Sequence, residues 1–250
     1  MRSLLRLIAR LDIKGKNVVK GVQMEGLRVV GDPVEMAQQY AASGADEILY
    51  IDTVASLYGR NQLEALLEKT CLEVFVPITV GGGIRSKADA RRMLNAGADK
   101  IAINTAAIER PDLINELADH FGSQAVVVSI EAKRVNGGWE CYTDNGRNAS
   151  SRDAVQWALE SVTRGAGELL ITSVDRDGTR RGFDTELVAE IAPNVAVPVT
   201  ASGGMGNLEH LRSVLRDGKA DAVAVASMLH YGKTNFAEMR AAAQSIRTLT

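Results

Sequence analysis

The sequence predicts an α/β fold: a (β/α)8 TIM barrel built from two homologous half-barrels. Short apolar runs alternate with amphipathic segments, eight of the runs have strand length, and motifs of the first half recur about 120 residues later. Eight strand–helix units in 250 residues match the size of such a barrel. We therefore expect a single barrel over residues 1–250, with half-barrels at about 1–122 and 123–250. A doubly wound open sheet is the structural alternative.

Eight apolar runs of strand length follow one another along the chain. In order they are Leu5–Ile13, Glu47–Asp52, Val76–Val80, Lys100–Ile103, Ala125–Glu131, Glu168–Ser173, Val197–Ser202 and Ala222–Ala226. After the first run, Asp32-Pro33-Val34-Glu35 predicts a helix start, because Asp caps the first turn, Pro fits the first helical position and Glu completes a capping box. Ser86-Lys87-Ala88-Asp89 is a weaker start of the same kind. Strands and helices therefore alternate, as a parallel barrel requires.

The sequence repeats itself at an interval that matches half a barrel. Pro77-Ile78-Thr79-Val80-Gly81-Gly82-Gly83 recurs 121 residues later as Pro198-Val199-Thr200-Ala201-Ser202-Gly203-Gly204. The segment 98–105 is echoed by 220–227 at an offset of 122. Asp12, at the end of the first strand, corresponds to Glu131 at the end of the fifth, so a pseudo-twofold axis would place the two carboxylates opposite each other across the barrel mouth.

Composition excludes several classes of function. A net charge of −2 and a pI of about 6.0 argue against a surface for nucleic acid or for an anionic membrane. Cys71 and Cys141 form no CxxC or Cys/His cluster, so the cytoplasm is the expected compartment. His120, His210 and His230 lack ligand spacing. We expect no metal and no other cofactor.

Each half carries a Gly-Gly turn after its third strand and a small polar cluster after its fourth. Such glycines let backbone N–H groups approach a ligand, and a following helix N-terminus favours an anion. One such turn is equally well explained by a tight loop, but two related by symmetry favour two phosphate sites and an extended substrate with a phosphate at each end. The candidate phosphate-binding residues are Gly82, Gly83, Asn104 and Thr105 in the first half, and Gly203, Gly204, Ala226 and Ser227 in the second.

Asp12 and Glu131 would flank the middle of such a substrate. Paired carboxylates suit general acid–base catalysis if their environments separate their pKa values. The alternative is that each only caps a loop. Asp177 and Gly178, in Asp175-Arg176-Asp177-Gly178-Thr179 after the sixth strand, have the character of a ligand-binding loop and are further candidate phosphate-binding residues, with a solvated turn as the alternative.

Charged residues also stand at the first position of four of the strands. Arg6, Glu47, Lys100 and Glu168 begin the first, second, fourth and sixth strands, and period-two alternation puts Arg6 on the inner side with Asp12. Two cations and two anions would form a closed ring of ion pairs at the barrel bottom. Because desolvated pairs are an inefficient source of stability, a gate is a candidate role; a structural plug is the alternative.

These motifs resemble those of the cyclase subunit of imidazole glycerol phosphate synthase, the HisF family, over nearly the whole chain. The closest agreements are Val19-Lys20-Gly21, Gly31-Asp32-Pro33, the segment 79–85 (Thr-Val-Gly-Gly-Gly-Ile-Arg), Phe121-Gly122-Ser123-Gln124, Thr172-Ser173 with the segment 175–179, and Ala201-Ser202-Gly203-Gly204.

The resemblance implies an enzyme that takes ammonia from a glutaminase subunit docked at the barrel bottom. At the mouth it would convert a bisphosphorylated formimino carboxamide ribotide into imidazole glycerol phosphate and an aminoimidazole carboxamide ribotide, a step of histidine biosynthesis. By the same resemblance Asp12 and Glu131 are the catalytic carboxylates and Lys20 lies in a mobile first loop. Thr172 and Ser202 are assigned with Lys20 to the substrate loops, and the ring at the strand starts is an ammonia gate.

Two residues depart from the family pattern. The first strand of that family ordinarily ends Cys-Leu-Asp, whereas here it ends Arg10-Leu11-Asp12, and Glu131 stands where the family has Asp. We expect Arg10 to pair with Glu131 and lower its pKa. This leaves open a HisF-like paralogue that channels ammonia for acetamidino-sugar (surface polysaccharide) biosynthesis. A sugar-phosphate isomerase of the same two-half barrel family and a non-enzymatic scaffold are further alternatives.

Overall fold

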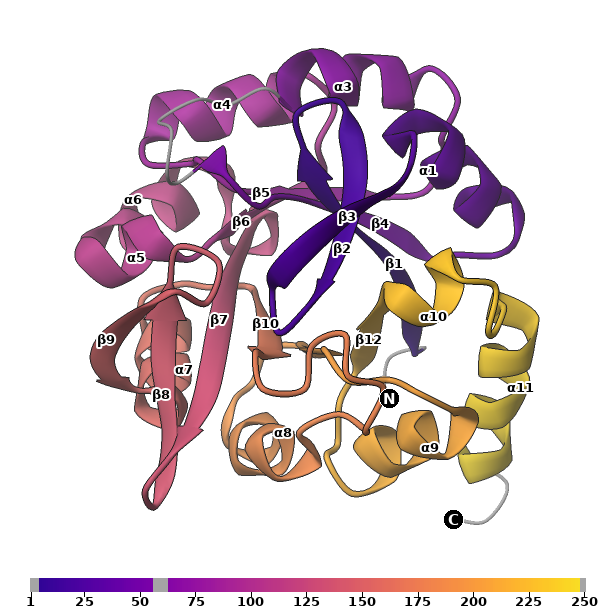
Figure 1. Cartoon of the computed structure of the whole chain (residues 1–250). Helices are drawn as coiled ribbons and strands as arrows, with labels where there is room; N and C mark the ends of the chain where they lie inside the picture. Colours follow the sequence, from indigo (N-terminus) through magenta and orange to yellow (C-terminus); the bar gives the residue numbers. More distant parts are fainter. Residues whose placement is uncertain (1–4, 56–62, 248–250) are drawn as a thin grey trace.

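The predicted barrel is confirmed by a computed structural model, which describes residues 5–55 and 63–247 (Figure 1). Eight parallel strands surround the axis, and the pairing of β10 with β7 closes the circle. In spatial order they are β10 (Glu168–Ser173), β11 (Val199–Ser202), β12 (Ala222–Val225), β1 (Arg6–Lys14), β4 (Glu47–Asp52), β5 (Ile78–Gly81), β6 (Lys100–Ile103) and β7 (Val126–Val135).

Helices ring the strands, as Figure 1 shows. They are α1 (Pro33–Ala42), α3 (Leu63–Cys71), α4 (Lys87–Asn95), α5 (Thr105–Glu109), α6 (Asp112–Phe121), α7 (Ala154–Thr163), α8 (Thr185–Ile191), α9 (Leu208–Arg216), α10 (Ser227–His230) and α11 (Phe236–Arg247), with short 3-10 turns at Ser123–Ala125 and Ala192–Asn194. The predicted start of α1 is confirmed, since the Asp32 carboxylate accepts hydrogen bonds from the backbone N–H groups of Val34 and Glu35. None of the described helices is long and apolar enough to cross a membrane.

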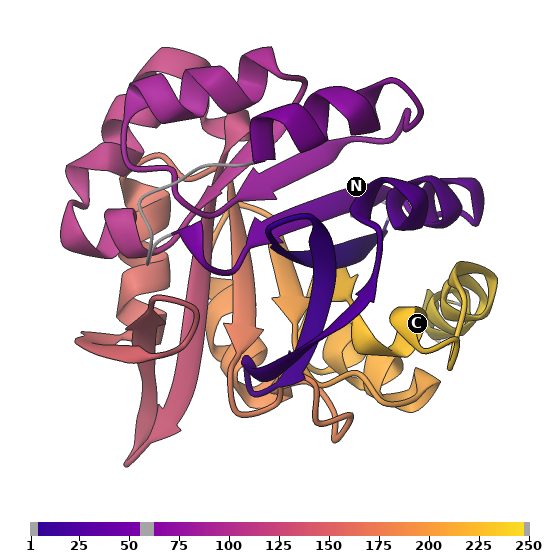
Figure 2. The same cartoon turned by 45° about the horizontal axis from the view of Figure 1, so that its top comes forward.

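Two antiparallel hairpins that the sequence analysis did not predict are inserted at the carboxyl ends of β1 and β7. One is β2 (Asn17–Val22) with β3 (Glu25–Gly31), and the other is β8 (Gly138–Thr143) with β9 (Asn148–Asp153). Their turn residues, Gln23 with Met24 and Asp144 with Asn145, all have positive φ angles, a conformation that follows the twist of a hairpin. The first hairpin crosses the barrel mouth, and the extended end of β7 projects beyond the barrel with β8 (Figure 2).

The barrel interior is layered. Along β1 the alternate residues Arg6, Ile8, Arg10 and Asp12 face inward. A small apolar cluster, separate from the main core between strands and helices, fills the middle of the barrel; it comprises Ile8, Leu49, Ala102, Val127, Leu170, Ala222 and Ala224. Charged groups therefore lie at both ends of the barrel, with an apolar layer between them.

A close backbone approach at Gly167 fixes the start of β10. A Cβ atom at this position would lie 2.1 Å from the carbonyl oxygen of Ser123, and a backbone atom cannot rotate away. We predict that Gly167→Ala lowers the free energy of unfolding by about 2 kcal/mol or more, as overpacking does. Urea unfolding checks this against Gly138→Ala, where the nearest atom is 3.6 Å away. Equal stability of the two variants would contradict this close approach of Gly167 to Ser123.

Candidate active site

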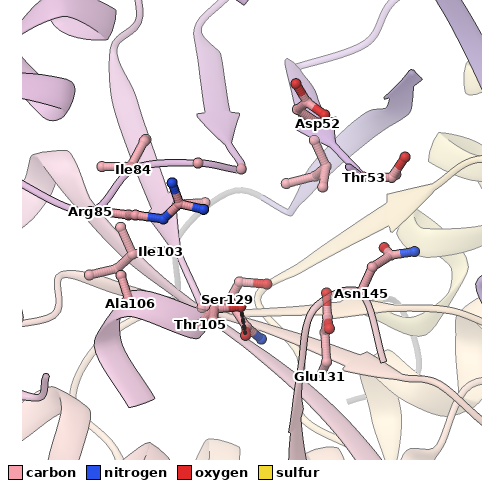
Figure 3. Close-up of a pocket in the computed structure, with 15 residues that line it drawn as sticks. Asp52, Thr53, Ile84, Arg85, Ile103, Thr105, Ala106, Ser129, Glu131 and Asn145 are labelled. Carbon is pink, nitrogen blue, oxygen red and sulfur yellow. Dashed lines mark hydrogen bonds between the residues drawn. The ribbon is translucent and has the colours of Figure 1, made fainter. Parts of the chain in front are cut away.

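Two pockets open at the carboxyl ends of the barrel strands. The first encloses about 570 Å³ beyond β5 and β6, and Figure 3 shows Glu131 and Asn145 on one side of it with Ile84 and Arg85 on the other. The second encloses about 280 Å³ beyond β10, β11 and β12. The structure brings the predicted phosphate-binding residues to these pockets: Gly82, Gly83, Asn104 and Thr105 line the first, and Asp177, Gly178, Gly203, Gly204, Ala226 and Ser227 line the second.

The glycine turns of the two pockets are geometrically alike. Gly82 has a φ angle of 101°, and a Cβ atom there would lie 2.5 Å from the carbonyl oxygen of Asp52. Gly203 has a φ angle of 88°, and a Cβ atom there would lie 2.8 Å from the carbonyl oxygen of Ser173. Only glycine satisfies both conditions at either position. The repeated motif therefore forms, in each pocket, the same stretch of backbone with no side chain covering it.

The residues that precede α5 and α10 also match. Asn104 has φ and ψ angles of −126° and −87°, and Ala226 has angles of −121° and −83°. Neither residue caps its helix with a side-chain hydrogen bond. The first N–H groups of both helices thus lack a capping side chain, and they suit a ligand that carries hydrogen-bond acceptors.

Asp12 is buried and held by two cations. Its Oδ1 accepts a hydrogen bond of 2.8 Å from Nε of Arg10, and its Oδ2 accepts one of 3.1 Å from Nζ of Lys20. Burial alone would raise the pKa of Asp12, but the charges of Arg10 and Lys20 outweigh it and hold the pKa well below its usual range. Asp12 is therefore ionised throughout the mildly acidic and neutral pH range.

Lys20 closes the first hairpin over the mouth. It lies in β2 rather than in a loop, it is only 4% exposed, and its Nζ also donates to Oδ2 of Asp177 over 2.8 Å. Further bonds hold the hairpin turn: among them, the Gln23 N–H donates to the carbonyl oxygen of Asp177, and the Asn145 side-chain amide donates to that of Met24. The first hairpin is thus bonded to the loop after β10 and to the second hairpin.

Glu131 has a different environment. Its Oε2 accepts a hydrogen bond of 2.7 Å from the Gly146 N–H, and within the described ranges no cation lies at ion-pair distance from it. Burial raises the pKa of Glu131 to about 7, although the more distant charge of Arg10 and the Gly146 bond act in the opposite direction. A carboxyl with this pKa exchanges protons near neutral pH, whereas Asp12 does not.

The four charges at the strand starts meet at the opposite end of the barrel. Arg6 donates to Glu47 and Glu168, each over 2.8 Å. Lys100 donates to the same two carboxylates over 2.9 Å and 2.8 Å. Each cation therefore bridges both anions, and the ring is closed.

Proteins of related sequence decide the family. A protein of Legionella pneumophila named imidazole glycerol phosphate synthase subunit HisF is 61% identical over 206 residues, which are 82% of this chain and 97% of that protein. A protein of Myxococcus xanthus (strain DK1622) with the same name is 49% identical over 249 residues, 98% of each chain. A family model described as histidine biosynthesis protein matches residues 6–235. The chain belongs to the HisF family.

In this HisF chain the expected pairing of Arg10 with Glu131 is wrong. Arg10 turns its Nε to Asp12, two residues along the same strand, and its Nη1 to the hydroxyl groups of Thr172 and Ser202 over 3.0 Å and 3.1 Å. With no cation bound, burial decides the pKa of Glu131, which rises instead of falling. Thr172 and Ser202 are strand residues of β10 and β11 that hold Arg10, not loop residues.

Sequence analysis also missed groups that complete these sites. In the ring, Thr79 donates to Glu47 and Thr200 donates to Glu168, in each case from a residue 32 positions later. Both threonines belong to the repeated Pro-x-Thr motif, which was a usable signal. Asn145 and Gly146 come from the second hairpin, whose strand sequences do not repeat those of the first hairpin.

The raised pKa of Glu131 has a consequence for stability. The folded protein retains a proton on Glu131 that the unfolded chain, with a pKa near 4.5, releases, so stability falls as pH rises from about 4.5 to about 7. We predict that Glu131→Gln melts at a higher temperature than wild type at pH 8 and shows no such advantage at pH 4.5. Thermal unfolding at both pH values measures this. An advantage independent of pH would mean that the Glu131 pKa is ordinary.

Proposed function

We propose that this enzyme is the cyclase subunit of imidazole glycerol phosphate synthase in histidine biosynthesis and that Asp12 and Glu131 are its catalytic carboxylates. The observation that carries the proposal is a pair of matching glycine-lined pockets with two carboxyl groups at the same mouth. The pKa of Asp12 is lowered, whereas the pKa of Glu131 is raised. The substrate would be a bisphosphorylated formimino carboxamide ribotide, with one phosphate in each pocket. With ammonia consumed, the products would be imidazole glycerol phosphate, aminoimidazole carboxamide ribotide and one water, which carries away the carbonyl oxygen that the ammonia nitrogen replaces.

The two carboxyl groups suit different parts of this reaction. Joining an ammonia nitrogen to the substrate and releasing the carboxamide ribotide requires one nitrogen to lose protons and another to gain one. Glu131, with a pKa of about 7, is available in both protonation states near neutral pH and carries these protons. Asp12 stays ionised and stabilises positive charge as it develops on nitrogen.

The ring of Arg6, Glu47, Lys100 and Glu168 is proposed as the entry for ammonia. It lies at the opposite end of the barrel from both pockets, with the apolar layer between. Uncharged ammonia crosses such a layer more easily than ammonium does, since a buried ion is strongly penalised. The partner at this end would be a glutaminase subunit, and the ring would open toward it.

The chain would be one barrel over residues 1–250 made of half-barrels at about 1–122 and 123–250. Matching pockets and the matching threonine–glutamate bonds of the ring support this division.

A second function is favoured by one observation. Arg10 fills part of the second side of the mouth, where the family pattern has a cysteine. A paralogue that passes ammonia on for acetamidino-sugar synthesis would have no need of cyclase geometry. The assay that separates the two functions is steady-state turnover of the bisphosphorylated ribotide with saturating ammonium salt and no glutaminase; absence of turnover would favour the paralogue.

For the cyclase, Asp12→Asn removes the fixed negative charge while the backbone amides of the pockets remain. We predict that ammonia-dependent turnover falls by on the order of 100-fold or more while affinity for the ribotide stays within a few-fold. Kinetics and calorimetric titration measure the two quantities. Asp217→Asn, at the exposed end of α9, is the control. A loss below tenfold would remove Asp12 from the mechanism.

For the ring, Lys100→Ala removes one of the two bridging cations without touching the mouth. We predict that activity with glutamine and the glutaminase subunit falls more than activity with ammonium salt. The ratio of the two rates measures this, and the exposed Lys87→Ala is the control. Equal loss of both activities would make the ring a structural plug.

A further inference from the structure

The two halves of the barrel differ at an inner position next to the carboxylates of the mouth. Arg10 precedes Asp12 by two residues, and Ser129 precedes Glu131 by two residues. Both residues face the mouth: Arg10 lines the second pocket and Ser129 the first. A guanidinium group in one half thus corresponds to a hydroxyl group in the other.

Arg10 is anchored on three strands. Its side chain is only 4% exposed, and besides Asp12 on β1 it reaches Thr172 on β10 and Ser202 on β11. A guanidinium is planar and holds its donors in a fixed fork, so these bonds set its orientation. The orientation of Arg10 in turn sets the position of the Asp12 carboxylate.

The charges around Arg10 balance. Arg10, Asp12, Lys20 and Asp177 form a buried row of two cations and two anions. Removing one member of such a row leaves another charge without its partner, which is strongly unfavourable. Lys20 belongs to the hairpin that covers the mouth, whereas Arg10 belongs to the barrel. Arg10 is therefore the partner of Asp12 that the barrel wall itself supplies.

We infer that Arg10 is a positioning residue that holds Asp12 as a fixed, ionised carboxylate and thereby leaves Glu131 as the proton carrier of the mouth. The inference rests on the proposed function for its meaning in catalysis. Its physical content, the dependence of Asp12 on Arg10, is independent of which substrate is turned over. The arginine at position 10, where the family pattern has a cysteine, then determines that Asp12 stays ionised and that Glu131 transfers protons.

The test compares wild type with Arg10→Gln and Arg10→Lys. Carbon-13 NMR of aspartate-labelled protein follows the Asp12 carboxyl, assigned by its absence in Asp12→Asn. We expect its titration midpoint to rise by about one pH unit or more in Arg10→Gln and to return toward wild type in Arg10→Lys, because an opposite charge at this distance shifts a pKa by that much. In the ammonia assay, Arg10→Gln should lower kcat by on the order of 10- to 100-fold with KM within a few-fold, and Arg10→Lys should recover most of the loss.

Two further variants keep the test decisive. Thr172→Val removes one anchor of the guanidinium and should move the Asp12 midpoint in the same direction by a smaller amount, so it serves if Arg10→Gln does not fold. Arg216→Gln breaks the exposed pair with Asp217 and should leave the midpoint unchanged.

An unchanged Asp12 midpoint in folded Arg10→Gln would overturn the inference. A rise in KM with unchanged kcat would also overturn it, because Arg10 would then be a substrate-binding group. Failure of wild type to turn over the ribotide would count against the proposed function only, and the NMR titration would still decide the role of Arg10.

Discussion

A row of four buried charges, Arg10, Asp12, Lys20 and Asp177, joins the barrel wall, the hairpin over the mouth and the loop after β10. The arrangement of the mouth depends on it. Lys20 holds the hairpin against the mouth through ion pairs with Asp12 and Asp177. Arg10, on the barrel wall, fixes the Asp12 carboxylate. Every charge in the row is buried, so the loss of one leaves a neighbouring charge without an ion-pair partner, which is strongly unfavourable. The four side chains are therefore ordered as one unit. The closed mouth and the charge on Asp12 are consequences of the same contacts.

Several features outside this row occur at corresponding places in the two proposed half-barrels. The same glycine turn, the same backbone before a short helix and the same threonine–glutamate bond occur once in each half. Symmetry suits a substrate with a phosphate at each end, but it does not suit proton transfer, for which two identical carboxyl groups would be a disadvantage. Arg10 in one half and Ser129 in the other break this correspondence beside the two carboxyl groups for which the proposed mechanism needs a difference.

Most of the fold could be predicted from the sequence because the barrel strands are short apolar runs with period-two alternation. The starts of β5 and β11 were placed about two residues early because Val76 and Val197 are apolar but lie before the first ladder bonds. Both hairpins were missed, since one strand of each, β3 and β9, has no buried residue and the repeated motifs do not extend into the hairpins. The predicted pairing of Arg10 with Glu131 was wrong for a different reason. Alternation tells which face a side chain points to, but not which of several acceptors on that face it reaches.

The proposed mechanism therefore rests on a difference between two carboxyl groups at one mouth: the pKa of Asp12 is lowered so that it is ionised at mildly acidic pH, whereas Glu131 is protonated there. Infrared difference spectroscopy of wild type against Glu131→Gln observes that proton directly, through the carbonyl stretch of a protonated carboxylic acid. We predict a band at pH 6 that is present only in wild type and disappears with a midpoint near pH 7. A band already lost by pH 5, or no band at all, would show that Glu131 is an ordinary ionised carboxylate and would contradict the division of roles on which the mechanism depends.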